Sequence, residues 1–191
     1  MSEPEITTVS AEEITSRLVA GDILLTRFPS GGLLAEAIEV GQSLADGHTA
    51  IWGHAMRYVG DGQVISQEWR VRLKPLSAWA GSYLCRLHNP AYSPEQRQTL
   101  VFLALRAEGR LYDVLGLLGQ ALRGLPLVGG LASRVVQVPW LTYCSEMVAE
   151  HERRVNPGFM AGTPKPAPDE MPPWARAHGW LVETYRLESA A

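Results

Sequence analysis

The chain of 191 residues has few cysteines, no excess of basic charge and no long uninterrupted apolar run. Its two cysteines, Cys85 and Cys144, are too few for a disulfide scaffold of this length, and a reducing cytosol would keep both as thiols. The net charge is -3 and the isoelectric point is near 6.0, so no basic field is available to hold a phosphate backbone. We therefore expect no nucleic-acid partner.

The longest apolar stretch, residues 115–131, is interrupted by glycines, a glutamine and an arginine, and a membrane span needs about 20 apolar residues. The N-terminus is polar and acidic and lacks the basic start and apolar stretch of a secretory signal. We therefore expect a cytoplasmic protein with no transmembrane segment. Hydrophobic residues make up 46% and charged residues 19%, which is ordinary for a soluble globular protein. This composition predicts a single domain over residues 1–191.

Apolar periodicity and turn residues predict an α+β fold in which an antiparallel sheet packs against helices. The clearest pattern is a β-hairpin, with strands at 54–59 and 63–69 around a Gly-Asp-Gly turn. Other strands are expected at 23–27, 71–76, 83–88 and 180–187. Helices are expected at 10–20, 33–41, 94–107 and 141–152 and from about residue 112, and the proline-rich segment 157–173 is expected to be extended.

One residue in the hairpin has side-chain chemistry suited to catalysis. His54 stands at the start of the first hairpin strand, where ladder hydrogen bonds can fix the direction of its ring. A lone histidine is more often structural, and this alternative remains open.

A second chemical signal lies about ninety residues further along the chain. Cys144 occupies the expected first turn of a helix, in the segment Tyr-Cys-Ser-Glu-Met-Val. The helix dipole and the free backbone N–H groups of a first turn favour a thiolate and can bind an oxyanion. The alternative is that Cys144 is a small buried apolar residue, as free cysteines often are.

In combination these motifs resemble the circularly permuted branch of the NlpC-type papain-like amidases and peptidases, the YiiX/YaeF-like group. The histidine hairpin precedes the cysteine helix, as it does in that branch. Gly-Asp-Ile-Leu at 21–24, Tyr-Asp-Val-Leu-Gly at 112–116 and the proline/acid segment at 168–173 are also similar to its motifs. The resemblance spans residues 21–187 and implies a papain-like fold.

The resemblance implies that Cys144 is the nucleophile and His54 its base, acting through a thioester without metal or cofactor. The family often carries a glutamate near the position of Ser66. We expect Glu68, on the same strand face and charged, to orient the imidazole, with Ser66 as the alternative.

The resemblance also implies candidate residues for substrate binding and a class of substrate. Tyr143, Tyr112, Asp113 and Trp52 are candidates for substrate binding, and a structural role is the alternative for each. The expected substrate is a cell-wall peptide or a similar small amide. An acyl or lipid hydrolase or transferase and a non-catalytic ligand-binding module remain alternatives. A Gly-rich apolar insertion at about 115–136 is either a pair of short packed helices or a lid that contacts lipid.

Overall fold

The structure, a computed structural model, describes residues 6–27, 51–67, 70–110 and 144–189. Several predictions lie outside these residues: the helices at 33–41 and from residue 112, the Gly-rich insertion, and four candidate site residues. Those four are Glu68, Tyr112, Asp113 and Tyr143.

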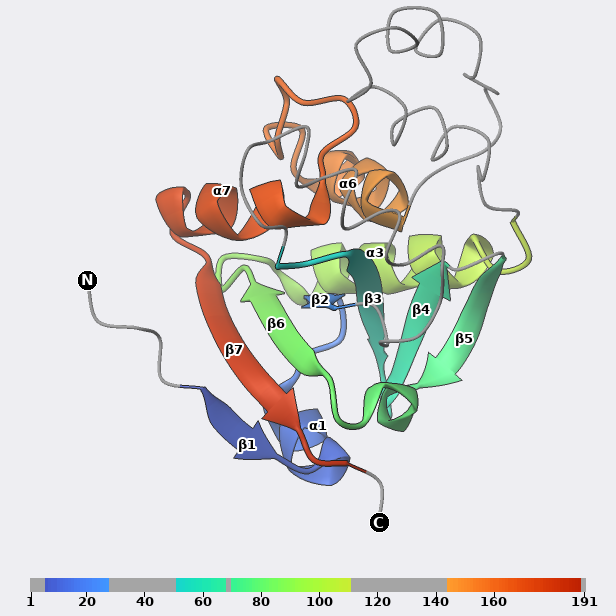
Figure 1. Ribbon diagram of the computed structural model, residues 1–191. Helices are drawn as coiled ribbons and strands as arrows, with labels where there is room; N and C mark the ends of the chain where they lie inside the picture. Colours follow the sequence, from blue (N-terminus) through green and yellow to red (C-terminus); the bar gives the residue numbers. More distant parts are fainter. Residues whose placement is uncertain (1–5, 28–50, 68–69, 111–143, 190–191) are drawn as a thin grey trace, which may run out of the picture.

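A seven-stranded sheet forms the centre of the described part of the molecule, with strand order β1-β7-β6-β2-β3-β4-β5 (Figure 1). All neighbouring strands pair antiparallel except β1 and β7, which pair parallel. The strands are β1 (Thr7–Val9), β2 (Ile23–Thr26), β3 (His54–Gly60), β4 (Gln63–Gln67), β5 (Val71–Pro75), β6 (Tyr83–His88) and β7 (Leu181–Leu187). The sequence predicts all of these strands except β1, which is only three residues long.

Four α-helices accompany the sheet in the described residues: α1 (Ala11–Arg17), α3 (Pro94–Arg106), α6 (Cys144–Val155) and α7 (Met171–Ala177). Serine side chains cap two of these helices, since Ser10 Oγ accepts the Glu13 N–H and Ser93 closes a capping box with Gln96. Two short 3-10 helices, η1 (Leu76–Trp79) and η3 (Pro168–Glu170), complete the set. The prediction of an α+β fold with an antiparallel sheet packed against helices is confirmed. No described helix has both the length and the apolar character needed to cross a bilayer.

The prediction that 157–173 is extended throughout is wrong at its end, where η3 leads into α7. Two prolines follow Met171 at the start of α7. A proline within the first helical turn costs no hydrogen bond, because the first N–H groups of a helix have no partner inside it. The prolines therefore begin a helix here and do not prevent one.

The two faces of the sheet bury separate apolar cores. One core lies between the sheet and helices α3, α6 and α7 and includes Ile23, Ala55 and Val148. The other packs under α1 and includes Met56 and Tyr58. Alternation along β3 thus sends residue 55 toward α6 and residue 56 toward α1, as strand geometry requires. We call the first of these the α6 face.

Candidate active site

His54 is the first residue of β3 and is almost completely buried. Its Nε2 atom lies 2.8 Å from the hydroxyl oxygen of Ser66 on β4. Ser66 pairs directly with Met56 in the ladder, so it shares a sheet face with His54 two residues earlier. The hairpin therefore brings a neutral hydrogen-bonding group to the far side of the imidazole, as the sequence predicts for this strand face. The partner is the residue expected as the alternative, and Glu68 lies beyond the described part of β4.

Cys144 is the first residue of α6 and belongs to the core on the α6 face. Its thiol receives hydrogen bonds from the backbone of Ala55, of Ser145 and of Cys144 itself. Ala55 directly follows His54, so the thiol lies beside the backbone that carries the histidine. The two motifs ninety positions apart thus meet where β3 begins. Cys144 lies on the α6 face there, whereas His54, like Met56 and Ser66, belongs to the opposite face of the sheet at the first residue of the strand.

Burial raises the pKa of the Cys144 thiol above its ordinary value, and the backbone hydrogen bonds lower it by smaller amounts. The expectation that the helix start favours a thiolate describes only the smaller effect. Burial outweighs it here because the thiol is 4% exposed. The residue therefore rests as a neutral thiol and needs a base to become a nucleophile.

The segment that leads into β3 is held by Asp169 of η3. The Asp169 carboxylate accepts the backbone N–H of Trp52 at 2.7 Å and that of Ile51 at 3.0 Å. Two charge-assisted hydrogen bonds fix the chain just two residues before His54. Sequence reasoning assigned no role to Asp169, although the proline/acid segment that contains it was one of the matched motifs. The contact joins residues more than one hundred positions apart, which no local pattern reveals.

A buried ion pair joins α6 to β3. Arg57 Nη1 lies 2.5 Å from Glu152 Oε1, and both side chains are fully buried. Arg57 also donates to the carbonyl oxygens of Gly21 and Val148, and Tyr92 donates its hydroxyl hydrogen to the second Glu152 oxygen at 2.6 Å. Because Arg57 follows His54 on β3 and Glu152 follows Cys144 on α6, this pair fixes the two catalytic candidates relative to one another.

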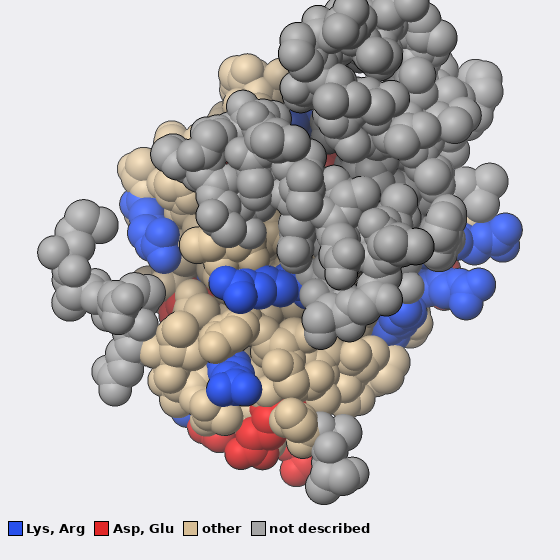
Figure 2. Space-filling view, viewed as in Figure 1, with Lys and Arg blue, Asp and Glu red and all other residues tan. Residues whose placement is uncertain are grey.

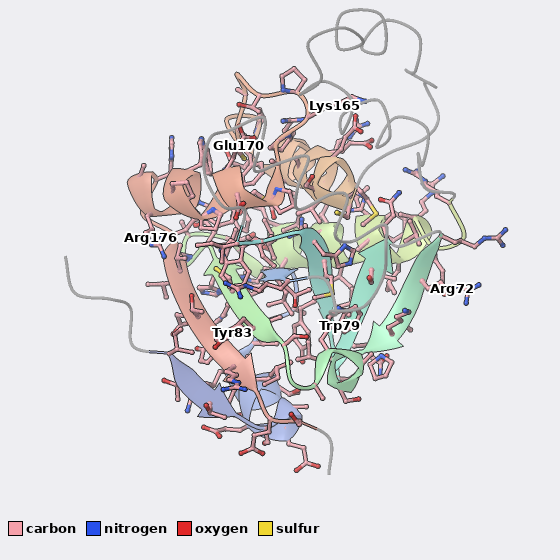
Figure 3. All side chains as sticks on the ribbon, in the orientation of Figure 1. Arg72, Trp79, Tyr83, Lys165, Glu170 and Arg176 are labelled. Atoms are coloured by element: carbon pink, nitrogen blue, oxygen red, sulfur yellow. The ribbon has the colours of Figure 1, made fainter. Side chains whose placement is uncertain are left out.

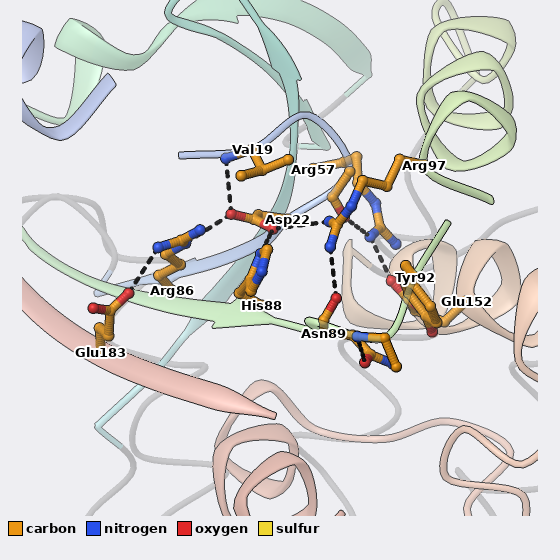
Figure 4. A network of polar contacts seen from close by, with 12 residues as sticks. Val19, Asp22, Arg57, Arg86, His88, Asn89, Tyr92, Arg97, Glu152 and Glu183 are labelled. Atoms are coloured by element: carbon orange, nitrogen blue, oxygen red, sulfur yellow. Dashed lines mark hydrogen bonds and ion pairs between the residues drawn. The ribbon is translucent and has the colours of Figure 1, made fainter. Parts of the chain in front are cut away.

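The Gly-Asp-Ile-Leu motif supplies a second buried carboxylate, at Asp22 (Figure 4). Its oxygens bind Arg86 Nε and His88 Nδ1, each at 2.7 Å, and accept the Val19 N–H at 3.0 Å. Gly21 before it has φ +99°, which favours glycine. Asp22 directly precedes β2. His54 pairs with Thr26, which is the last residue of β2, so Asp22 and His54 lie at opposite ends of this strand. The motif therefore joins β2, β6 and the preceding turn and is structural in this chain.

Trp52 is the one candidate substrate-binding residue within the described part of the chain. Its side chain is 8% exposed and packs in the core on the α6 face. Over the described residues, no group of three or more histidine, cysteine or acidic side chains is arranged to hold a metal ion.

Comparison with known proteins gives a distant structural likeness. No family model matches the chain, and no curated protein matches it. Among solved structures it is similar to the metalloprotein YiiX from Escherichia coli O157:H7, described as DUF1105. The TM-score is 0.49 at 20% sequence identity, over 73% of this chain and 67% of the other. A likeness of this degree assigns neither an activity nor a residue role to the present chain.

Proposed function

We propose that the chain is a cysteine hydrolase that cleaves a small amide through a thioester, with Cys144 as nucleophile and His54 as base. The observation that carries the proposal is the hydrogen bond that holds the His54 ring. A buried imidazole whose Nε2 is bonded to Ser66 stands at the residue next to the backbone that contacts the Cys144 thiol. Acyl-transfer chemistry requires a nucleophile, a base and a group that orients the base, and Cys144, His54 and Ser66 are proposed for these three roles.

In the proposed reaction His54 Nδ1 takes the thiol proton as the Cys144 sulfur attacks the substrate carbonyl. Because the resting thiol is neutral, proton removal accompanies attack. The carbonyl oxygen becomes an oxyanion next to the backbone N–H groups at the start of α6. The intermediate collapses when the imidazolium returns the proton to the leaving amine, and the C–N bond breaks. Water, deprotonated by His54, then hydrolyses the thioester and restores the thiol.

The direction of the Ser66 hydrogen bond decides which nitrogen of His54 acts. If Nε2 donates its hydrogen to Ser66 Oγ, Nδ1 carries no hydrogen and can accept the thiol proton. A neutral hydroxyl holds this tautomer with less electrostatic support than a carboxylate gives. The proposed enzyme is therefore expected to be slower than one with an acidic residue at this position.

A turnover measurement tests the proposal. The wild-type chain is expected to release p-nitrophenol from p-nitrophenyl octanoate, an activated acyl substrate that a thiol can attack. Cys144→Ala and His54→Ala are each expected to lower kcat/KM by about 1,000-fold or more, the usual cost of removing a nucleophile or its base. Cys85→Ala is the matched control, because Cys85 is a buried thiol on β6 and is expected to leave kcat/KM unchanged. Equal activity in wild type and Cys144→Ala would overturn the proposal.

A further inference from the structure

Two arginines share one aromatic ring at the end of the sheet that carries His54. The Arg27 guanidinium carbon lies 5.2 Å from the centroid of the Tyr83 ring, and that of Arg186 lies 5.8 Å from it. Both distances are within the range of cation–π attraction. Both arginines are exposed and Tyr83 is half-buried, so the ring is a fixed platform and the two charged groups face solvent.

The strand register places this cluster beside the candidate active site. Thr26 pairs with His54 on one side and with Leu84 on the other, and Tyr83 pairs with Arg186. Residues 54, 26–27, 83–84 and 185–186 therefore form one row across β3, β2, β6 and β7. With strands about 4.8 Å apart, Tyr83 lies about 10 Å from the strand of His54. Side chains at 27, 83 and 186 lie on the α6 face, which is also the face of Cys144.

The charged side chains that β2, β6 and β7 place on this face are basic, although the whole chain has a net charge of -3. None of the residues that share it on β2, β6 and β7 is an aspartate or glutamate. Within the described residues, neither Arg27 nor Arg186 forms an ion pair with a carboxylate. Arg176 of α7 adds a third positive charge near this face. Its charge lowers the pKa of Cys85, which lies on β6 between β2 and β7.

The figures show the same distribution. In Figure 3 Arg176 is labelled at the upper left, on α7, and Tyr83 lies below it on β6. In the same view, Figure 2 shows Lys and Arg side chains over this part of the surface, while the largest group of acidic side chains visible lies at the lower edge.

Two guanidinium groups held against one ring repel each other, and a bound anion removes that repulsion. Guanidinium groups are also the side chains best suited to bind carboxylate or phosphate through paired hydrogen bonds. We propose that Arg27 and Arg186, held on Tyr83, bind a carboxylate or phosphate group of the substrate about 10 Å from the strand that carries His54. The inference rests on the proposed function and adds the substrate class: an anionic acyl compound.

Two esters of equal chain length test this inference. p-Nitrophenyl octanoate ends in a methyl group, and mono-p-nitrophenyl suberate ends in a carboxylate at the same carbon. The wild-type chain is expected to prefer the suberate. Arg27→Gln with Arg186→Gln is expected to lower kcat/KM for the suberate roughly 10- to 100-fold, the usual value of charge-assisted hydrogen bonds, and to leave the octanoate unchanged.

Two further variants make the result specific. Arg72→Gln removes one positive charge from exposed strand β5 at the far edge of the sheet and is expected to keep the suberate preference. Arg27→Glu with Arg186→Glu is expected to reverse the preference, toward p-nitrophenyl 8-(trimethylammonio)octanoate. Equal loss for octanoate and suberate, or the same loss in Arg72→Gln, would overturn the inference.

A binding measurement separates this inference from the proposed function. Calorimetry on Cys144→Ala protein, which cannot turn over substrate, is expected to detect suberate or inorganic phosphate and to lose the signal when both arginines are replaced by glutamine. Tighter binding of suberate identifies a carboxylate as the natural group, and tighter binding of phosphate a phosphoryl group. If neither ester is hydrolysed but arginine-dependent binding persists, the proposed function fails and the anion site stands. If neither anion binds, or binding ignores the arginines, the anion site is refuted.

Discussion

The Ser66 hydroxyl determines how the His54 ring is held. It is buried with the imidazole and lies 2.8 Å from Nε2, so loss of the hydroxyl would leave a buried ring nitrogen without this partner. The hydroxyl contact favours the tautomer that carries hydrogen on Nε2, and only that tautomer leaves Nδ1 able to accept the thiol proton. The contribution of Ser66 is therefore to turnover more than to binding.

Ser66→Ala is expected to lower kcat for p-nitrophenyl octanoate by about ten-fold with little change in KM, because positioning of a general base contributes to the chemical step. Ser66→Thr keeps the hydroxyl and is expected to restore most of the activity. The measurement is steady-state kinetics of the three proteins across pH, where loss of the pinned tautomer also alters the pH profile of kcat. Full activity in Ser66→Ala, together with a large loss in Glu68→Ala, would show that the charged residue is the orienting group.

At the scale of elements, the contact between α6 and β3 decides whether the site exists at all. Each element carries one reactive residue at its start and one member of the Arg57–Glu152 pair further along. A fully buried ion pair adds little net stability compared with an apolar pair, but removal of one charge leaves the other buried and unpaired. The pair therefore fixes how α6 lies on the sheet.

Glu152→Gln is expected to lower the free energy of unfolding by about 3 kcal/mol, because the Arg57 charge would remain buried without its carboxylate. Glu150→Gln is the matched control on the same helix. The Glu150 side chain is 45% exposed and lies 3.8 Å from Arg154, so its replacement is expected to cost less than about 1 kcal/mol. Urea denaturation of both variants supplies the comparison. A similar cost at the two positions would contradict the role given to the buried pair.

At the scale of the whole molecule, the sequence predicts the parts of the fold that local patterns encode. The hairpin turn and the apolar pattern of the strands each act over a few residues, and the predicted strands lie within one or two residues of their observed bounds. β1 could not be predicted, because three residues pairing parallel with the last strand carry no local signal. The α7 helix lies where the sequence predicts an extended proline-rich segment, because prolines favour extended chain within a segment but also suit the first turn of a helix.

The candidate site also has a part that the sequence predicts and a part that it does not. The residue types and the order of their motifs single out His54 and Cys144 from the sequence, and the resemblance supplies their roles. The contacts that hold them could not be predicted, because Asp169 with Trp52 and Arg57 with Glu152 join residues about one hundred positions apart. The dominance of burial over the helix dipole at Cys144 is also a property of tertiary packing.

The two thiols of the chain offer the most direct test of the central claim, because both are buried and only Cys144 is proposed to have a base. Burial raises the pKa of Cys85 to about 12, with smaller opposing effects from Arg176 and Thr184. At pH 7 only about one Cys85 molecule in 10⁵ is a thiolate, so its alkylation is expected to be slow and to rise about ten-fold per pH unit from pH 7 to 10. The pKa of Cys144 is raised as well, and without assistance its alkylation would be similarly slow.

The measurement is the rate of iodoacetamide alkylation at each cysteine of the intact folded chain at pH 7, read by peptide mass spectrometry. The Cys85→Ala and Cys144→Ala variants assign the two signals. If His54 serves as the base of Cys144, alkylation of Cys144 is expected to exceed that of Cys85 by at least about ten-fold, and His54→Ala is expected to remove most of the difference. Equal rates at the two thiols, or a fast Cys144 that is unaffected by His54→Ala, would contradict the nucleophile and base assigned here.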